Sequence, residues 1–227
     1  MRARALLLLL GGAGCSWTPP SIGDPGAEVA DPRAEASYRA ALEKATQHRE
    51  VYSALDTQLY CAATYQSPEF REARVRRQAL FQTWPQSKLD QALASERAEA
   101  TQGHDVVLGL SLVDRRFDDL DSKNTIWRLS LVTDQGEVTP LAIRRVGRAN
   151  QDLRAYYPYL GEFWTMYTVR FPTAVAGKPL VGPATQALVF RLSSTQGQVE
   201  MKFPLAPRGT TAGPTAPGSP PSPPASR

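Results

Sequence analysis

The polarity pattern divides the chain into a part with a helical period and a part with a strand period. Between Pro32 and Gly103, apolar residues recur at spacings of three and four, which places them on one side of a helix. From Asp105 onward the spacing changes to two, which is typical of strands with one buried face. The pattern therefore predicts an α+β chain in which two to three helices pack on a following β-sheet structure.

Two capping signals mark the starts of the first two helices. In Asp31–Pro32 and in Ser67–Pro68, a capping residue precedes a proline at the first helical position, where the missing N–H costs nothing. The first apolar stripe continues to about Thr64, with an interruption at 48–50, so we expect one long helix that breaks there. Its stripe consists of Tyr38, Leu42, Ala45, Tyr52, Leu55, Leu59 and Ala62.

The second and third helices follow closely. The second is expected to turn an apolar face of Phe70, Ala73, Leu80 and Phe81 toward the core and to end at 84–85. Ser87, with Asp90 three residues further on, resembles a capping box and predicts the start of a third, shorter helix. Gly103 is expected to close that helix.

The strand part predicts an antiparallel sandwich of immunoglobulin-like type, because short strands follow one another with turn signals between them. The expected strands are 106–113, 125–133, 138–146 and 162–171, followed by a hairpin of 188–192 and 199–203. Pro140 limits its strand to an edge or a bulge. The side chains expected to point inward include Trp127, Leu129 and Leu131 in one strand, and Phe163, Thr165, Tyr167, Val169 and Phe171 in another.

The N-terminus has the pattern of a secretory signal. Arg2 and Arg4 precede an apolar run at 5–10, and small residues then lead to Cys15. The apolar run is too short for a transmembrane helix, which needs about 20 residues. An ordinary cleaved signal with an accidental cysteine is the alternative interpretation.

The segment Gly12-Ala13-Gly14-Cys15 resembles the lipobox of bacterial lipoproteins, with Gly12 where that family usually has leucine. The resemblance implies cleavage after Gly14 and attachment of diacylglycerol and a further acyl chain such as palmitate to Cys15, which would hold the chain on a membrane. Ser16 after the cysteine implies sorting to the outer membrane. The sequence DDLDSKNTIW, together with MYTVRFP, is similar to uncharacterised envelope lipoproteins of diderm bacteria.

Composition completes the predicted organisation. The segment 15–31 is rich in proline and glycine and predicts a tether, and 207–227 lacks large apolar residues and predicts a disordered tail. The expected parts are a signal peptide (1–14), the tether (15–31), a helical region (32–103), a β-sandwich (104–206) and the tail (207–227).

Charge and residue spacing argue against several classes of function. The formal net charge is +4, and removal of Arg2 and Arg4 leaves a nearly neutral chain without the field that steers proteins to nucleic acid. His48 and His104 have no metal-ligand spacing around them, and no cofactor motif is present, so neither a metal nor a cofactor is expected. The aspartates of 114–121 depart from a calcium loop and favour a solvated turn. Cys61 has apolar neighbours and is expected to be a small buried residue.

Two groups of residues are candidates for binding. Arg71, Arg74 and Arg77 give the second helix a basic side, which would meet anionic groups or remain a solvated face. The aromatic segment with Tyr156, Tyr157 and Tyr159 either presents tyrosines to a partner or packs against the rest of the protein. We therefore expect a lipid-anchored, non-catalytic binding or scaffolding protein of the envelope, with an envelope protein as a possible partner. The alternative is an envelope hydrolase that uses an Asp/Glu pair.

Overall fold

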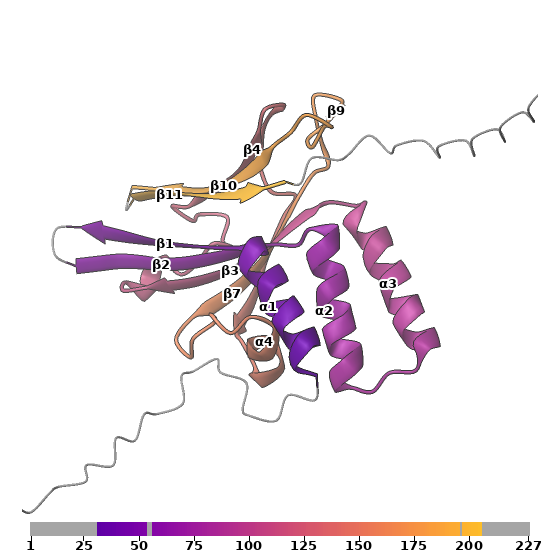
Figure 1. Cartoon of the computed structure of the whole chain (residues 1–227). Coiled ribbons are helices and arrows are strands. Elements are labelled where there is room, and N and C mark those ends of the chain that lie inside the picture. The colour runs from indigo at the N-terminus through magenta and orange to yellow at the C-terminus, as the bar shows by residue number, and fades with distance from the viewer. Residues whose placement is uncertain (1–30, 54–55, 196, 206–227) are drawn as a thin grey trace, which may run out of the picture.

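The computed structural model describes residues 31–53, 56–195 and 197–205, and it confirms that the chain combines helices with antiparallel sheets (Figure 1). The helices of the described part are α1 (Pro32–Ala45), α2 (Pro68–Phe81), α3 (Gln86–Ala100) and the short α4 (Gln151–Tyr156), with a 3-10 turn at Arg115–Phe117. Helix α2 lies between α1 and α3 and contacts both.

The first two helix starts are confirmed by their capping contacts. The Asp31 carboxylate accepts from the backbone N–H of Arg33 at 3.0 Å, and the Ser67 hydroxyl accepts from the N–H of Phe70 at 3.2 Å. The third helix is confirmed, but Ser87 does not cap it, because α3 begins at Gln86 and has no side-chain cap. Its C-cap is Thr101 instead of the expected Gly103.

The prediction of one long helix to Thr64 was wrong beyond Ala45. A hairpin of β1 (Thr46–Ser53) and β2 (Asp56–Tyr65) follows α1 directly. Strand β2 is covered on both faces, and its residues exposed by less than 9% include Leu59, Cys61, Ala62, Ala63, Thr64 and Tyr65. Apolar residues at consecutive positions fit a helical period as well as a strand period, so the pattern could not separate the two.

Strands β1 and β2 belong to a five-stranded antiparallel sheet with the order β1-β2-β3-β7-β6. Its other strands are β3 (His104–Leu112), β6 (Ala142–Arg148) and β7 (Thr165–Phe171). The hairpin of the expected helical region 32–103 therefore pairs directly with the first strand of the region 104–206.

A second, four-stranded sheet has the order β11-β10-β4-β5. Its strands are β4 (Arg128–Thr133), β5 (Gly136–Val138), β10 (Ala187–Ser194) and β11 (Gly197–Pro204), and a small ribbon joins β8 (Ala174–Val175) to β9 (Lys178–Pro179). The last hairpin is confirmed, because Phe190 pairs with Met201 and Leu192 with Val199. The expected strand 138–146 is corrected: its two ends belong to different sheets, and Pro140 lies between β5 and β6.

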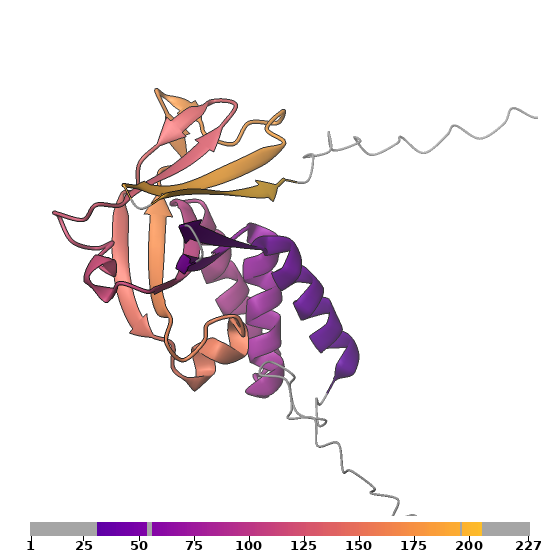
Figure 2. The same cartoon turned by 90° about the vertical axis from the view of Figure 1, so that its left-hand side faces the viewer.

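The main core lies between the two sheets. The predicted inward positions Trp127, Leu129 and Leu131 are confirmed, with 4%, 5% and 0% of their surfaces exposed. Phe163 was predicted to point inward and is instead 63% exposed, because β7 begins only at Thr165, after a turn in which the N–H of Trp164 donates to Gly161. Figure 2 shows the helices on one side of the five-stranded sheet and the strands β10 and β11 on the other.

Candidate functional site

The five-stranded sheet has two different faces. Its inner face packs against the second sheet through side chains such as Leu108, Tyr167 and Val169. Its outer face packs against α1, α2 and the segment around α4 through Val107 and Met166. Gly109 lies on the outer face, and a Cβ atom there would lie 2.5 Å from Leu160 and 2.9 Å from Trp164. The glycine thus allows the segment after α4 to approach the sheet closely.

Helix α2 turns arginines, and not only apolar residues, toward the outer face. The side chains of Arg71 and Arg77 are only 6% and 9% exposed. Of the predicted apolar face, Phe70 is buried, but Leu80 and Phe81 are 38% and 52% exposed. The interpretation of Arg71 and Arg77 as part of a solvated basic face is therefore wrong, because buried acceptors on neighbouring elements receive their guanidinium groups.

Arg77 joins three elements. Its Nε and Nη2 donate to the two carboxylate oxygens of Glu35 in α1 at 2.7 and 3.0 Å, and its Nη1 donates to the carbonyl of Ala155 at 2.8 Å. The same guanidinium lies over the ring of Tyr38, 4.6 Å from its centroid. Burial alone would raise the pKa of Glu35, but hydrogen bonds from Arg77 and Arg39 outweigh burial and lower the pKa below its ordinary value.

The predicted tyrosine segment lies against α1, α2 and β2. Tyr157 is 3% exposed and donates to Gln66 Oε1 at 3.2 Å, and the hydroxyl of Tyr159 lies 2.7 Å from that of Thr64. The carbonyl of the half-buried Tyr156 accepts from the Tyr38 hydroxyl at 2.6 Å. Burial raises the pKa of both Tyr157 and Tyr159, so their hydroxyls stay protonated. These contacts give the tyrosine segment a packing role.

An alternating chain of charges runs from α2 across α3 to the sheet. Arg74 donates to Glu96 at 2.6 Å, and Arg71 donates to Glu96 at 2.9 Å and also contacts Asp105 of β3. Arg170 of β7 donates to Asp105 at 2.7 Å and contacts Glu99 of α3. We call these six residues, Arg74, Glu96, Arg71, Asp105, Arg170 and Glu99, the ion-pair chain. It ties α3 and α2 to the sheet through directional contacts.

The ion-pair chain forms one wall of a groove of about 720 Å³, which we call the α2–β7 groove. The floor is mainly apolar and includes Val107, Val146, Leu153 and Met166. At its open side lie Ala142 and Arg144 of β6, both exposed. The buried Nε of Arg74, also at this groove, has no hydrogen-bond acceptor among the described residues. The groove therefore combines an apolar floor with donors that can meet an anionic or polar ligand.

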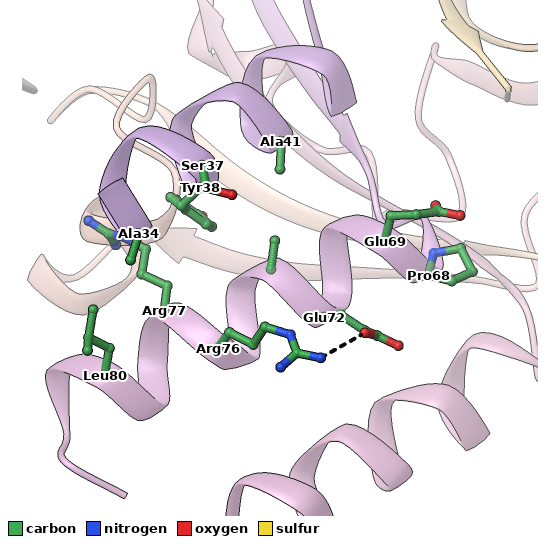
Figure 3. Close-up of a pocket in the computed structure, with 11 residues that line it drawn as sticks. Ala34, Ser37, Tyr38, Ala41, Pro68, Glu69, Glu72, Arg76, Arg77 and Leu80 are labelled. Atoms are coloured by element: carbon green, nitrogen blue, oxygen red, sulfur yellow. Dashed lines mark hydrogen bonds and ion pairs between the residues drawn. The ribbon is translucent and has the colours of Figure 1, made fainter. Parts of the chain in front are cut away.

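A second hollow, the α1–α2 groove, lies between the first two helices (Figure 3). It has a volume of about 640 Å³ and runs between the small side chains Ala34, Ser37 and Ala41 of α1 and the facing side of α2. Figure 3 shows Arg76 reaching along α2 to Glu72, at 3.4 Å. Of the predicted binding residues, only Arg77 lines this groove, whereas Arg71, Arg74, Tyr156 and Tyr157 line the α2–β7 groove.

Two aspartates of the segment 114–121 have structural partners. Buried Asp118 accepts from Thr165 at 2.6 Å and from Tyr167 at 2.8 Å, whereas Asp114 binds Arg116. Within the ranges that the structure describes, no group of three or more His, Cys, Asp or Glu residues is placed to hold a metal ion. Cys61 is fully buried, and burial raises the pKa of its thiol to about 12, which leaves it unreactive.

Cys15, the predicted lipidation site, lies outside the described residues. None of the helices that the structure describes is both long enough and apolar enough to cross a membrane.

Sequence reasoning missed the acidic half of the ion-pair chain and the two strand arginines at the groove. Arg170 alternates with the buried Val169 and Phe171, and this alternation places it on the outer face. Arg144 pairs with Thr168 of the same strand, two residues from Arg170, and so lies on the same face. The alternation around Arg170 was present in the sequence. No signal in the sequence indicates that Glu96 and Glu99 approach Arg71 and Arg170, because these contacts depend on how α3 packs.

Comparison with known proteins gives little further information. No protein-family model matches the chain, and no curated protein matches it. The chain is similar to a crystal structure described as a novel protein of unknown function from Burkholderia pseudomallei, with 12% sequence identity and a TM-score of 0.37. The match covers 77% of this chain and 84% of that one.

Proposed function

We propose that this chain is a lipid-anchored protein of the bacterial cell envelope, held at the outer membrane through Cys15, whose folded part is a non-catalytic binding or scaffolding module. The anchor is supported by the lipobox-like segment that ends in Cys15. An immunoglobulin-like sandwich remains our prediction for the finer fold class, and two antiparallel sheets around one core support it.

The α2–β7 groove is the observation that carries the binding role. Its wall is fixed before any ligand arrives, because Arg71 and Arg170 are each held by two carboxylates. A preorganised site loses little conformational entropy when it binds. Its apolar floor and the exposed Arg144 at its rim offer both contact area and charge.

The same contacts favour binding over hydrolysis by an Asp/Glu pair. A glycosidase needs two carboxyl groups that face the scissile bond, one of them protonated. In the groove, Arg71 bridges Glu96 and Asp105, and Arg170 bridges Asp105 and Glu99. The carboxylates are thus engaged in charge-assisted hydrogen bonds with guanidinium groups, instead of facing a substrate.

The anchor is tested by replacing Cys15 with serine in the full chain. We expect the variant Cys15→Ser to lose fatty-acid labelling and to leave the membrane fraction, whereas Cys61→Ser, which removes the buried thiol, keeps both. Membrane retention and labelling of Cys15→Ser would contradict the proposal.

The binding role is tested by in-cell cross-linking followed by purification from detergent-solubilised membranes. The charge reversal Arg144→Glu at the groove rim is compared with Arg128→Glu, an exposed arginine on a strand of the other sheet. We expect a partner that is recovered with the wild type and with Arg128→Glu and is lost with Arg144→Glu. Identical cross-linked products from all three chains would contradict a binding role for the groove.

A further inference from the structure

Strand β6 forms an edge of the five-stranded sheet and pairs only with β7. The N–H of Gln66 donates to the carbonyl of Asp105, so Asp105 faces β2 and the next residue, Val106, faces β7. Val106 pairs with Val169, so Arg170 and Thr168 face β6, and their partners Ala142 and Arg144 turn their backbone groups toward β7. The backbone groups of Ile143 and Arg145 therefore point away from β7. Ile143 is half-buried and Arg145 is exposed. The edge of β6 therefore offers backbone donors and acceptors to an additional strand.

The other sheet edges in the described part of the chain are covered or short. Strand β1 contacts β11, and Arg49 of β1 donates to the carbonyl of Glu200 at 3.0 Å. Strand β5 has three residues and contacts β8. Strand β6 has seven residues, and a bulge between Arg145 and Gly147, where φ is +87°, limits the regular edge to its first half.

The charge of this edge is basic. Arg144 and Arg148 are exposed and have no carboxylate partner among the residues described, whereas Arg145 turns to the inner face and binds Asp118 at 3.1 Å. The carboxylates that line the α2–β7 groove, Glu96, Glu99 and Asp105, are already bound by arginines of the ion-pair chain. An incoming strand would therefore meet unpaired positive charge.

We propose that the edge of β6 binds an extended acidic peptide segment of a partner protein, which adds as a sixth strand beside Ala142–Arg145. The inference rests on the proposed binding function and names its ligand class. The side chains of an added strand alternate between faces, so every second one lies over the α2–β7 groove. Acidic side chains at these positions would contact Arg144. They would also lie on the same side of the sheet as Arg74, whose buried Nε has no acceptor among the described residues.

The experiment uses the full lipidated chain in detergent and a fluorescent, capped heptapeptide of alternating threonine and glutamate. Fluorescence anisotropy should show saturable binding, which glutamine in place of glutamate weakens at least tenfold. Arg144→Glu should weaken binding at least tenfold, and Arg128→Glu should change it less than twofold. Equal binding by the glutamine peptide, or unchanged binding by Arg144→Glu, would overturn the proposal.

Backbone methylation of the peptide tests strand addition without altering the protein. In a β-strand, alternate N–H groups point to opposite edges. Methylating one alternate set should abolish binding, and methylating the other set should leave binding nearly unchanged. Binding by both methylated peptides would mean charge attraction alone and would overturn strand addition. If no peptide binds but partner capture in cells still depends on Arg144, the proposed function holds and the acidic strand is wrong.

Discussion

The two faces of the five-stranded sheet are held by different kinds of interaction. The inner face meets the second sheet through an almost continuous apolar core that includes Leu110, Phe171 and Phe190. The outer face meets the helices through a smaller apolar cluster around Phe70 and Met166, supplemented by buried arginines and tyrosine hydroxyls.

The two faces therefore play different roles. The apolar core of the inner face contributes most of the stability, whereas the directional contacts of the outer face determine where the helices lie. Burial of apolar surface is non-directional and favours close packing of the two sheets. Hydrogen bonds and ion pairs are directional, and here they fix α2 and α3 at one side of the outer face. The other side, at β6, is left open as the α2–β7 groove.

Removing a large side chain from the inner core should have the largest effect. Trp127 is 4% exposed, and its indole N–H donates to the carbonyl of Phe117 at 2.8 Å. We expect Trp127→Ala to lower the free energy of unfolding by about 3–5 kcal/mol, through lost burial and a cavity. Urea unfolding measures this, with the exposed Phe163→Ala as control. Similar small losses from both variants would contradict the assigned core.

Breaking the buried ion pair between Arg77 and Glu35 on the outer face should lower the free energy of unfolding somewhat less. Arg77→Met leaves Glu35 buried with only Arg39 near it, at 3.5 Å, and we expect a loss of about 3 kcal/mol in urea unfolding. Replacing both partners, with Glu35→Leu added, should recover much of that loss because no buried charge remains unpaired. Arg76→Met, at an exposed pair, is the control and should stay within about 0.5 kcal/mol. If the double variant is no more stable than Arg77→Met, the loss does not come from the unpaired charge of Glu35.

The hydroxyl of Tyr157 should contribute less to the free energy of unfolding than the buried ion pair does. Tyr157→Phe removes the hydrogen bond to Gln66 but keeps the buried ring, so we expect a loss of about 1 kcal/mol in thermal or urea unfolding. Tyr157→Ala should lose more than about 2 kcal/mol because it also removes the packing. Tyr156→Phe serves as the matched control. The hydrogen bond from the Tyr38 hydroxyl goes to the backbone carbonyl of Tyr156, so this variant keeps it. A stable Tyr157→Ala variant would favour the alternative of a binding tyrosine.

The pH dependence should be the smallest effect. The pKa of Glu35 is lowered from 4.5 in the folded protein, so the stability from its ionised form is present above about pH 4.5 and is lost as the pH falls through the lowered pKa. Urea unfolding over this acidic range should show less pH dependence in the double variant Glu35→Leu/Arg77→Met than in the wild type. Equal slopes would contradict the contribution of Glu35.

The sequence predicted the features that depend on local signals and on simple alternation. The caps at Asp31 and Ser67, the inward set around Trp127 and the last hairpin follow from neighbouring residues, and each is confirmed. The hairpin after Ala45 could not be separated from a helix, because β2 is buried on both faces. The burial of Arg71 and Arg77 depends on carboxylates 25 to 42 residues away, which no local pattern reveals.

We propose that the binding surface lies on the outer face and its free edge, and hydrogen exchange locates such a surface directly. Amide exchange of the full chain in detergent is measured with and without the threonine–glutamate heptapeptide, at a concentration that saturates the anisotropy signal. We predict that added protection is confined to β6, above all at Ile143 and Arg145, and to the elements that line the α2–β7 groove, while β10 and β11 exchange unchanged. Protection on the second sheet, or none at β6, would contradict the account.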